Sequence, residues 1–241
     1  MNLPTIETPQ YTCMLPIAQK EVTYRPFLVG EQKSILVSQE ADDTKNSLRE
    51  VIRLIVSCTS DNVDVMTLSP VDLEFLFLQI RMVSVGETSD VGQDCEECGE
   101  ENEVQINYLS HRIMPAKKEV DKILKINENL LVELKAPTLL DMAEIQDKFG
   151  NEITEEDTMA TFAMLNKCIS KIIHEDEVLT RDDFSDEDLD KFLEGMTLDM
   201  LNYIMEYLAN QPKLVIPNDF ICKHCEAKNT NLIEGLQNFF G

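Results

Sequence analysis

The sequence predicts an α+β protein that is mostly helical, with a small zinc-ribbon-like β module interrupted by a helical subdomain. Three observations support this fold class: strand-like runs near the N-terminus, amphipathic helical stretches on both sides of a glycine- and cysteine-rich segment, and two C-x-x-C pairs far apart in the chain. The chain has 241 residues, 43% of them hydrophobic, which is enough to build the core of one or two domains.

The first part of the chain predicts an N-terminal β-hairpin followed by helices. Residues 11–17 and 21–27 are short strand-like runs with prolines near their ends. The helical patterns that follow cover residues 30–41, 47–58 and 70–82. The last pattern begins at Ser69-Pro70, where an N-cap residue precedes a proline at the first helical position. Because it is apolar nearly all round, we expect this helix to be central.

Composition changes at Gly86. Residues 85–103 are rich in glycine, cysteine and acidic side chains and show no apolar periodicity. Strand candidates follow at 103–109, 123–126 and 130–134. We therefore expect a β module to begin here.

From Pro137 the pattern becomes helical again. Thr138 and Thr154 open capping-box-like sequences, and the second leads into a helical apolar stripe that runs to Ile173. Further helices are expected near Ser185 and Thr197, and apolar residues within 231–240 predict a C-terminal helix. The expected regions are an N-terminal hairpin and helical region over 1–85, a first arm of the zinc-ribbon module over 86–136, an inserted helical subdomain over 137–211, and a second knuckle with the C-terminal helix over 212–241.

The C-x-x-C pairs Cys95–Cys98 and Cys222–Cys225 are the strongest candidates for a functional site. Each spacing puts two thiolates on one tight turn, and two such turns complete the tetrahedral four-sulfur site that Zn²⁺ favours. Asn102 and Asn229 each lie four residues beyond the second cysteine of their pair, so the two halves look like matched arms of a ribbon. The four cysteines would hold one structural Zn²⁺ per chain, with no coordination position left for water.

Two features argue against a shared metal. The separation is large, since 123 residues lie between Cys98 and Cys222. Gly99 suits the positive φ of such a turn, whereas Glu226 stands at the equivalent place in the second pair. We interpret the arrangement as a ribbon interrupted by an insertion, because the entropic cost of closing a loop grows only logarithmically with its length. The alternatives are two surface thiol turns without metal, or a redox-active pair, although neither pair lies in a thioredoxin-like βαβ pattern.

Charge and composition disfavour several functional classes. The chain has 45 acidic and 21 basic residues, a formal net charge of −24, which argues against binding to nucleic acid or to an anionic membrane surface. We expect neither a secretory signal nor a membrane span, and the seven cysteines, an odd number, indicate a reducing compartment. With three histidines and no catalytic motif, we expect a protein that is not an enzyme and has no small-molecule substrate.

Short motifs along nearly the whole chain also carry a family resemblance. They are Leu3-Pro4 with Thr8-Pro9 and Tyr11, Tyr24-Arg25-Pro26-Phe27 with Glu31 and Lys33, the stretch from Asp72 to Arg81, Ser84-Val85-Gly86-Glu87, the first cysteine pair, and Gly235-Leu236-Gln237 with Phe239-Phe240. In their order and spacing they resemble the baseplate hub assembly family of T4-like contractile-tailed bacteriophages. The resemblance implies a late protein with a non-enzymatic role in virion assembly, as an assembly factor or as a minor component of the hub.

The resemblance also implies partners and a location. The partners would be other baseplate hub proteins, met in the host cytoplasm during assembly or in the virion tail baseplate. Candidate partner-binding residues are Arg25, Pro26, Phe27, Phe239 and Phe240. For the first three a packing role is at least as well supported, because Pro26 forces Arg25 into an extended conformation. Two alternative functions stay open at this point: an acidic DNA mimic, and a zinc-ribbon adaptor that binds a nucleic-acid-handling protein.

Overall fold

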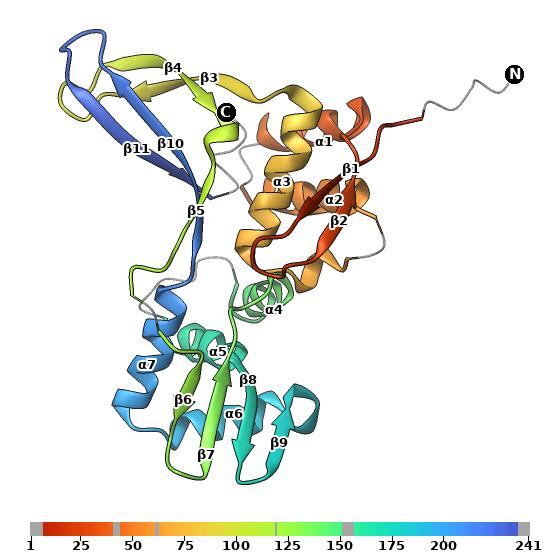
Figure 1. Ribbon diagram of the computed structural model, residues 1–241, viewed down its shortest axis with the longest axis vertical. Coiled ribbons are helices and arrows are strands. Elements are labelled where there is room, and N and C mark those ends of the chain that lie inside the picture. The colour runs from red at the N-terminus through yellow and green to blue at the C-terminus, as the bar shows by residue number, and fades with distance from the viewer. Residues whose placement is uncertain (1–6, 41–43, 61–62, 119, 151–156, 236–241) are drawn as a thin grey trace, which may run out of the picture. The chain divides into compact units, whose positions relative to one another are not determined.

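The computed structural model describes residues 7–40, 44–60, 63–118, 120–150 and 157–235, and their side chains except those of 35–49 (Figure 1). The described residues divide into two compact units. The first, here called the ribbon unit, comprises residues within Met1–Val65, Val71–Met114 and Lys213–Gly241. The second, the insertion unit, comprises residues within Met66–Pro70 and Pro115–Pro212.

The expectation of a mostly helical protein is wrong. The part of the chain that the structure describes is 40% helical and 29% strand, with its strands arranged in four sheets. The mixture of helix and sheet is consistent with an α+β protein. The difference comes from strands that lack a plain apolar alternation, and from one strand whose apolar spacing fits a helix equally well.

In the ribbon unit a short hairpin is tied to a central helix. Its first elements are strands β1 (Tyr11–Met14) and β2 (Glu21–Tyr24), which pair antiparallel, and helices α1 (Val29–Glu40), α2 (Thr44–Cys58) and α3 (Pro70–Val85). Asp72, in the first turn of α3, is buried and accepts hydrogen bonds from the backbone N–H groups of Ile17 (2.8 Å) and Ala18 (3.1 Å). These charge-assisted bonds hold the hairpin turn against the start of the helix. Buried residues are spread along α3, as its nearly continuous apolar sequence predicts.

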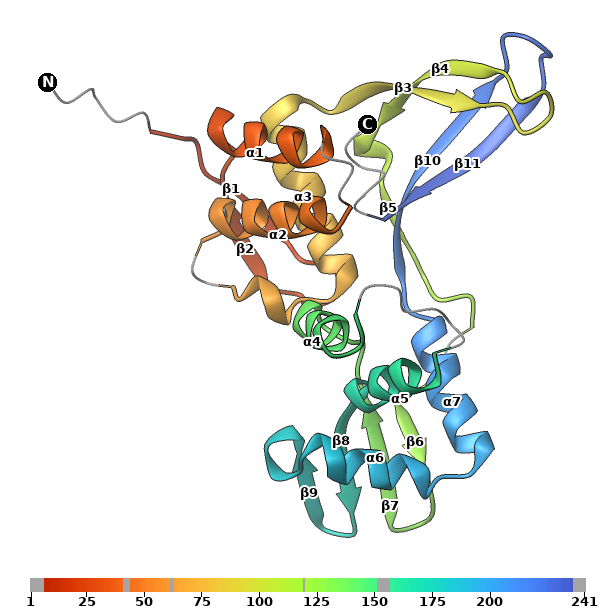
Figure 2. The ribbon, with the colours of Figure 1, turned by 180° about the vertical axis from the view of Figure 1, so that it is seen from behind.

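Two longer hairpins complete the ribbon unit (Figures 1 and 2). Strands β3 (Thr88–Asp94) and β4 (Glu101–Asn107) form the first, and β10 (Lys213–Ile221) and β11 (Lys228–Glu234) form the second. Strand β5 (Arg112–Met114) pairs with β10, so this sheet has the order β11-β10-β5. The connection from β5 to β10 runs through the insertion unit.

The β module is expected to begin near β3 but no separate strand is predicted there, and one assignment in these hairpins is wrong. Strand β3 falls in a stretch that shows no apolar periodicity, because its exposed residues include Asp90 and Asp94 and its half-buried residues include the polar Gln93. Residues 231–234, assigned by apolar spacing to a C-terminal helix, belong instead to β11, where pairing with β10 satisfies their backbone. The rest of that predicted helix, residues 236–241, lies outside the described residues.

The insertion unit packs helices against an antiparallel sheet of order β6-β7-β8-β9. Its strands are β6 (Ile123–Lys125), β7 (Leu130–Leu134), β8 (Ile169–His174) and β9 (Glu177–Thr180). Its helices are α4 (Leu139–Phe149), α5 (Thr158–Lys167), α6 (Asp186–Glu194) and α7 (Leu198–Ala209). Its core contains Val132 and Ile169 from the sheet and Leu165, Leu189 and Ile204 from the helices.

The helical stripe predicted to run to Ile173 is wrong from Ile169 onward, where the chain forms β8 and then β9. Residues 169–173 continue the helical apolar spacing of α5, but isoleucines are β-branched and also favour strands. Here Ile172 pairs with Val132 and with Leu179 across the sheet. The start of α5 also differs, since Asp157 is its N-cap and accepts a bond from the N–H of Ala160 (3.2 Å), while Thr154 lies outside the described residues.

Candidate metal centre

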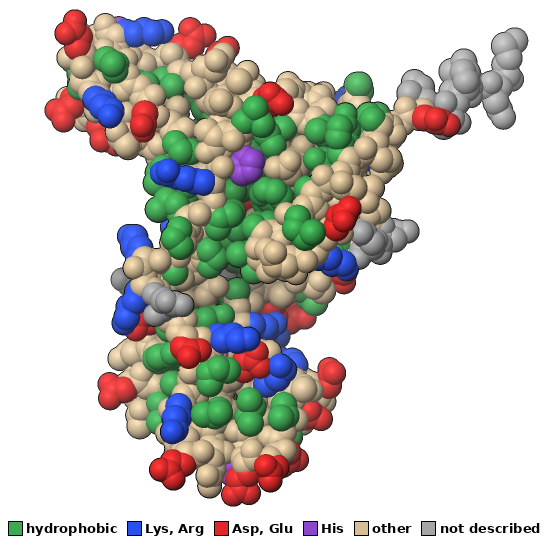
Figure 3. Space-filling view, in the orientation of Figure 1, with side chains coloured by type: hydrophobic (Ala, Val, Ile, Leu, Met, Phe, Trp, Pro, Cys, Tyr) green, Lys and Arg blue, Asp and Glu red, His purple; other side chains and the backbone are tan. Residues whose placement is uncertain are grey.

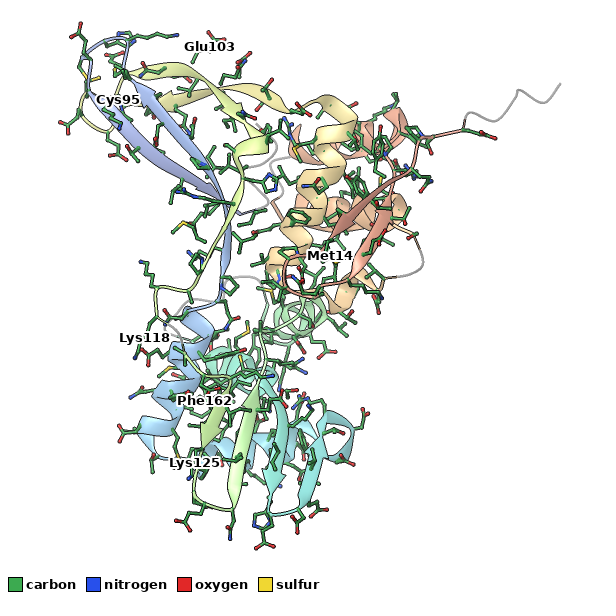
Figure 4. All side chains as sticks on the ribbon, viewed as in Figure 1. Met14, Cys95, Glu103, Lys118, Lys125 and Phe162 are labelled. Atoms are coloured by element: carbon green, nitrogen blue, oxygen red, sulfur yellow. The ribbon has the colours of Figure 1, made fainter. Side chains whose placement is uncertain are left out.

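The four cysteines of the C-x-x-C pairs come from the tips of the two long hairpins. Cys95 and Cys98 lie in the turn between β3 and β4, where Figure 4 labels Cys95, and Cys222 and Cys225 lie in the turn between β10 and β11. All four Sγ atoms lie within 4.8 Å of one another, and the Cys95–Cys225 and Cys98–Cys222 Sγ atoms are each 3.7 Å apart. A tetrahedral ion with metal–sulfur bonds of about 2.3 Å holds its sulfurs about 3.8 Å apart. The cluster therefore has the size of a four-thiolate metal site.

The two turns have the same backbone design. In the first, the N–H of Gly99 donates to the carbonyl of Cys95 (2.8 Å), and in the second the N–H of Glu226 donates to the carbonyl of Cys222 (3.1 Å). Gly99 has φ 72° and Glu226 has φ 61°, so both residues occupy the left-handed region. Glu226 adopts the conformation of the first turn although it lacks the freedom of glycine, at a cost of about 1–2 kcal/mol.

Two buried asparagines join each arm to the cysteine turn of the other arm. Asn102, in β4, accepts a hydrogen bond from the N–H of Lys223 (2.8 Å), and its Nδ2 lies 3.5 Å from Sγ of Cys222. Asn229, in β11, accepts from the N–H of Glu96 (3.0 Å), and its Nδ2 lies 3.5 Å from Sγ of Cys95. The matched spacing of these asparagines is visible in the sequence, but their hydrogen bonds to the cysteine turn of the opposite arm are not.

Hydrogen bonds favour the thiolate at the two buried cysteines. At Cys222 burial opposes ionisation, but backbone N–H groups of its own turn and the amide of Asn102 outweigh it and lower the pKa to about 6. The pKa of Cys95 is lowered chiefly by the N–H of Cys98, with help from the amide of Asn229. At the exposed Cys98 a backbone N–H favours the thiolate, but partial desolvation and the other three sulfurs raise the pKa to about 12. Four adjacent thiolates repel one another, so a divalent cation would stabilise their full ionisation.

Among the described residues, the other predicted site residues do not join the cysteine cluster. Arg25, which directly follows β2, donates to both carboxylate oxygens of Glu31 (2.7 and 3.0 Å) and to the carbonyl of Ser57 (2.9 Å). The N–H of Phe27 donates to the hydroxyl of Ser84 (3.0 Å), and Pro26 is half-buried. These contacts are internal to the ribbon unit and hold the start of α1 against α2 and α3. Phe239 and Phe240 lie outside the described residues.

One protein-family model, described as T4 bacteriophage base plate protein, matches residues 8–241. The chain belongs to this family. The match confirms the resemblance drawn from the short motifs, and it includes all four cysteines and both buried asparagines. As a T4 base plate family protein, the chain is expected to contact other components of the phage tail baseplate.

Neither the comparison with curated proteins nor the comparison with solved structures gave a significant match. In the part of the chain that the structure describes, no helix is both long and apolar enough to cross a membrane.

Proposed function

We propose that this base plate protein is a non-enzymatic assembly factor or minor component of the tail baseplate hub, and that Cys95, Cys98, Cys222 and Cys225 hold one structural Zn²⁺ per chain. The observation that carries the metal assignment is the cluster of four sulfurs within 4.8 Å. Thiolates are soft ligands, and a tetrahedral four-sulfur set is typical of zinc or of an iron–sulfur centre. We favour zinc because two matched C-x-x-C turns are the usual donors of structural zinc sites.

The metal would act as a cross-link and not as a reagent. Four protein ligands fill a tetrahedral shell, so no position remains for water or substrate. The ion would instead join the tips of two hairpins that are separated in sequence by residues Pro115–Pro212 of the insertion unit. Metal binding would therefore contribute directly to the folding free energy of the ribbon unit.

The hub role is supported by the family and by the charge of the chain. The motifs quoted above resemble hub assembly proteins in particular, and a net charge of −24 suits contacts with basic protein surfaces while it disfavours nucleic acid and anionic membranes. Such a protein would meet its partners in the host cytoplasm, where the cysteines stay reduced.

Two measurements on material from infected cells test the proposal. Mass spectrometry of assembly intermediates and mature tails should find the chain in hub intermediates, and in mature tails as well if it is a structural component. Elemental analysis of chain purified without chelator should give about one zinc per polypeptide. Absence from all tail intermediates would refute the hub role. Capture of a polymerase or DNA-binding protein, released by competing DNA, would favour the DNA-mimic alternative.

A further inference from the structure

We propose that the groove between the two long hairpins binds an extended, lysine- or arginine-bearing segment of another baseplate component, which adds as a strand to the free edge of β3. The inference rests on the proposed function and deepens it, because it names the surface through which the chain would meet a partner.

The groove lies between strands from the two arms. Residues 91–94 of β3 line one side and residues 230–233 of β11 line the other, together with Glu96 and Ile106. It is open to solvent and has a volume of about 830 Å³. A groove bounded by two strands favours an elongated occupant over a compact small molecule.

Both bounding strands are edge strands within the described residues, since β3 pairs with β4 and β11 pairs with β10 on one side each. The N–H of Cys95 donates to the carbonyl of Glu100 (3.0 Å). This bond shows which β3 residues direct their backbone N–H and C=O groups toward β4. Hydrogen-bonded residues alternate along an antiparallel strand, so the backbone groups of Asp94, Gly92 and Asp90 point toward the free edge. Such an edge is a template for an added strand.

The charge of the first hairpin selects a basic occupant. Between Thr88 and Asn107 it carries seven acidic side chains and neither lysine nor arginine. The acidic residues are Asp90, Asp94, Glu96, Glu97, Glu100, Glu101 and Glu103. None of them forms an ion pair with a described lysine or arginine. By contrast, residues 213–234 of the second hairpin carry three acidic and three basic side chains, Asp219, Glu226, Glu234, Lys213, Lys223 and Lys228.

Acidic side chains are visible around the hairpin tips in Figure 3. Acidic side chains without ion-pair partners, such as those of the first long hairpin, attract and orient a positively charged segment. The groove also offers apolar contacts, because Val91 is half-buried and Leu232 is exposed by 41%. A segment whose basic side chains alternate with apolar ones would match both features, since alternate residues of a strand face opposite sides.

The test uses the zinc-loaded, isotope-labelled full chain and a capped nine-residue peptide in which lysine and valine alternate. We expect the peptide to shift the backbone amide signals of residues 88–94 and 228–234, with an affinity that falls as salt rises. A peptide of the same charge with N-methyl groups on alternate residues should bind at least five-fold more weakly, because it cannot complete the strand ladder. A glutamate–valine peptide should not bind.

Matched charge reversals distinguish peptide binding in this groove from non-specific attraction of a basic peptide to an acidic protein. Asp94→Lys with Glu96→Lys should weaken peptide binding at least ten-fold, whereas Asp176→Lys with Glu177→Lys, the same charge change on the β8–β9 turn, should weaken it less than two-fold. Equal loss in both variants, equal binding of the N-methyl peptide, or signal changes away from the groove would overturn the proposal. A chain that holds zinc and is found in tail intermediates but ignores the peptide would refute the groove alone and leave the proposed function standing.

Discussion

The guanidinium carbon of Arg81 lies 3.7 Å from the centroid of the Tyr108 ring, and both side chains are buried. Arg81 also donates to the carbonyl of Gly86 (2.8 Å), and the Tyr108 hydroxyl lies 2.7 Å from that of Ser89. Arg81 belongs to α3, Ser89 to β3, and Tyr108 directly follows β4. The stack therefore joins the central helix to the base of the first long hairpin.

Replacing Arg81 should destabilise the ribbon unit. We expect Arg81→Met to lower the free energy of unfolding by about 2–3 kcal/mol, because the cation–π contact and the hydrogen bond to the half-buried Gly86 carbonyl are both lost. Tyr108→Phe should cost about 1 kcal/mol, since it keeps the ring and loses only the hydroxyl bond. Urea unfolding measures both effects. The control is Arg53→Met, an exposed arginine on α2, which should change stability by less than about 0.5 kcal/mol; equal losses at Arg53 and Arg81 would contradict a special role of the stack.

Loss of any one cysteine of the cluster should release the same metal. If Cys95 and Cys222 share an ion, Cys95→Ser and Cys222→Ser should lower the thermal midpoint by similar amounts and abolish stoichiometric zinc. The double variant should cost little more than either single one, because the second change acts on a site that is already broken. Zinc content and thermal unfolding of the three proteins provide the measurement.

Cys168→Ser is the matched control for the cysteine variants. Cys168 is the C-cap residue of α5 and is buried in the core of the insertion unit; it is not one of the four clustered cysteines. This variant should keep its zinc, whatever it does to stability. Strictly additive losses for Cys95 and Cys222, or full zinc in Cys222→Ser, would mean that the two turns do not share an ion.

The cysteine cluster could be predicted from the sequence because its members are set by spacing within two short turns. Local signals also predicted the caps of α4 and α6, where Thr138 and Ser185 form capping boxes. Strand β8 could not be predicted, because the spacing of Ile169, Ile172 and Ile173 suits helix and strand alike. The contact of Asn102 with the opposite turn depends on how two distant hairpins meet, which no local pattern contains.

Truncating either buried asparagine should loosen the contact between the arms. Asn102→Ala and Asn229→Ala each leave a backbone N–H of the opposite turn without its acceptor, which costs about 1–3 kcal/mol, and each removes a donor to a cysteine sulfur. We expect zinc affinity to fall by about 10-fold or more in both variants, measured by competition with a chromogenic chelator.

Asn202→Ala, at an exposed position on α7, is the control and should leave zinc affinity unchanged. If Asn102→Ala lowers stability but binds zinc as tightly as the unaltered chain, the asparagines hold the arms together without supporting the metal ligands.

The second cysteine turn should improve when it is made more like the first. Glu226 has φ 61°, so Glu226→Gly relieves a left-handed conformation and should raise the zinc-bound thermal midpoint by a few degrees, for about 1 kcal/mol. The reciprocal change, Gly99→Glu, should lower it by a similar amount, and open space at the Gly99 Cβ position excludes a clash as the cause. A lower midpoint for Glu226→Gly would show that the Glu226 side chain stabilises the turn by more than its left-handed backbone conformation destabilises it.

The stability of the ribbon unit should fall as the pH rises through neutrality because of Glu74. Burial raises the pKa of this α3 carboxyl to about 7, repulsion from Glu234 adds to the shift, and Lys213 opposes it. The folded chain thus keeps a proton that the unfolded chain releases near the ordinary value of 4.5. The stabilising contribution of the protonated Glu74 carboxyl is complete below pH 4.5 and is lost as the pH rises through 7. Glu74→Gln should therefore be more stable than the unaltered chain at pH 8, by about 1–2 kcal/mol after allowance for partial exposure.

Glu31 provides a comparison of opposite sign in the same unit. Hydrogen bonds from Arg25 lower its pKa to about 2, so its contribution is present above the ordinary value of 4.5 and is lost as the pH falls toward 2. Glu31→Gln should be less stable than the unaltered chain at pH 7, and the difference should shrink below pH 4.5, whereas the gain from Glu74→Gln should shrink from pH 8 down to pH 5. Loss of zinc in acid affects all three proteins, so the differences between their urea midpoints isolate each carboxyl. If the difference in urea midpoint between each variant and the unaltered chain stays constant from pH 3 to 8, neither carboxyl has the shifted pKa on which these predictions rest.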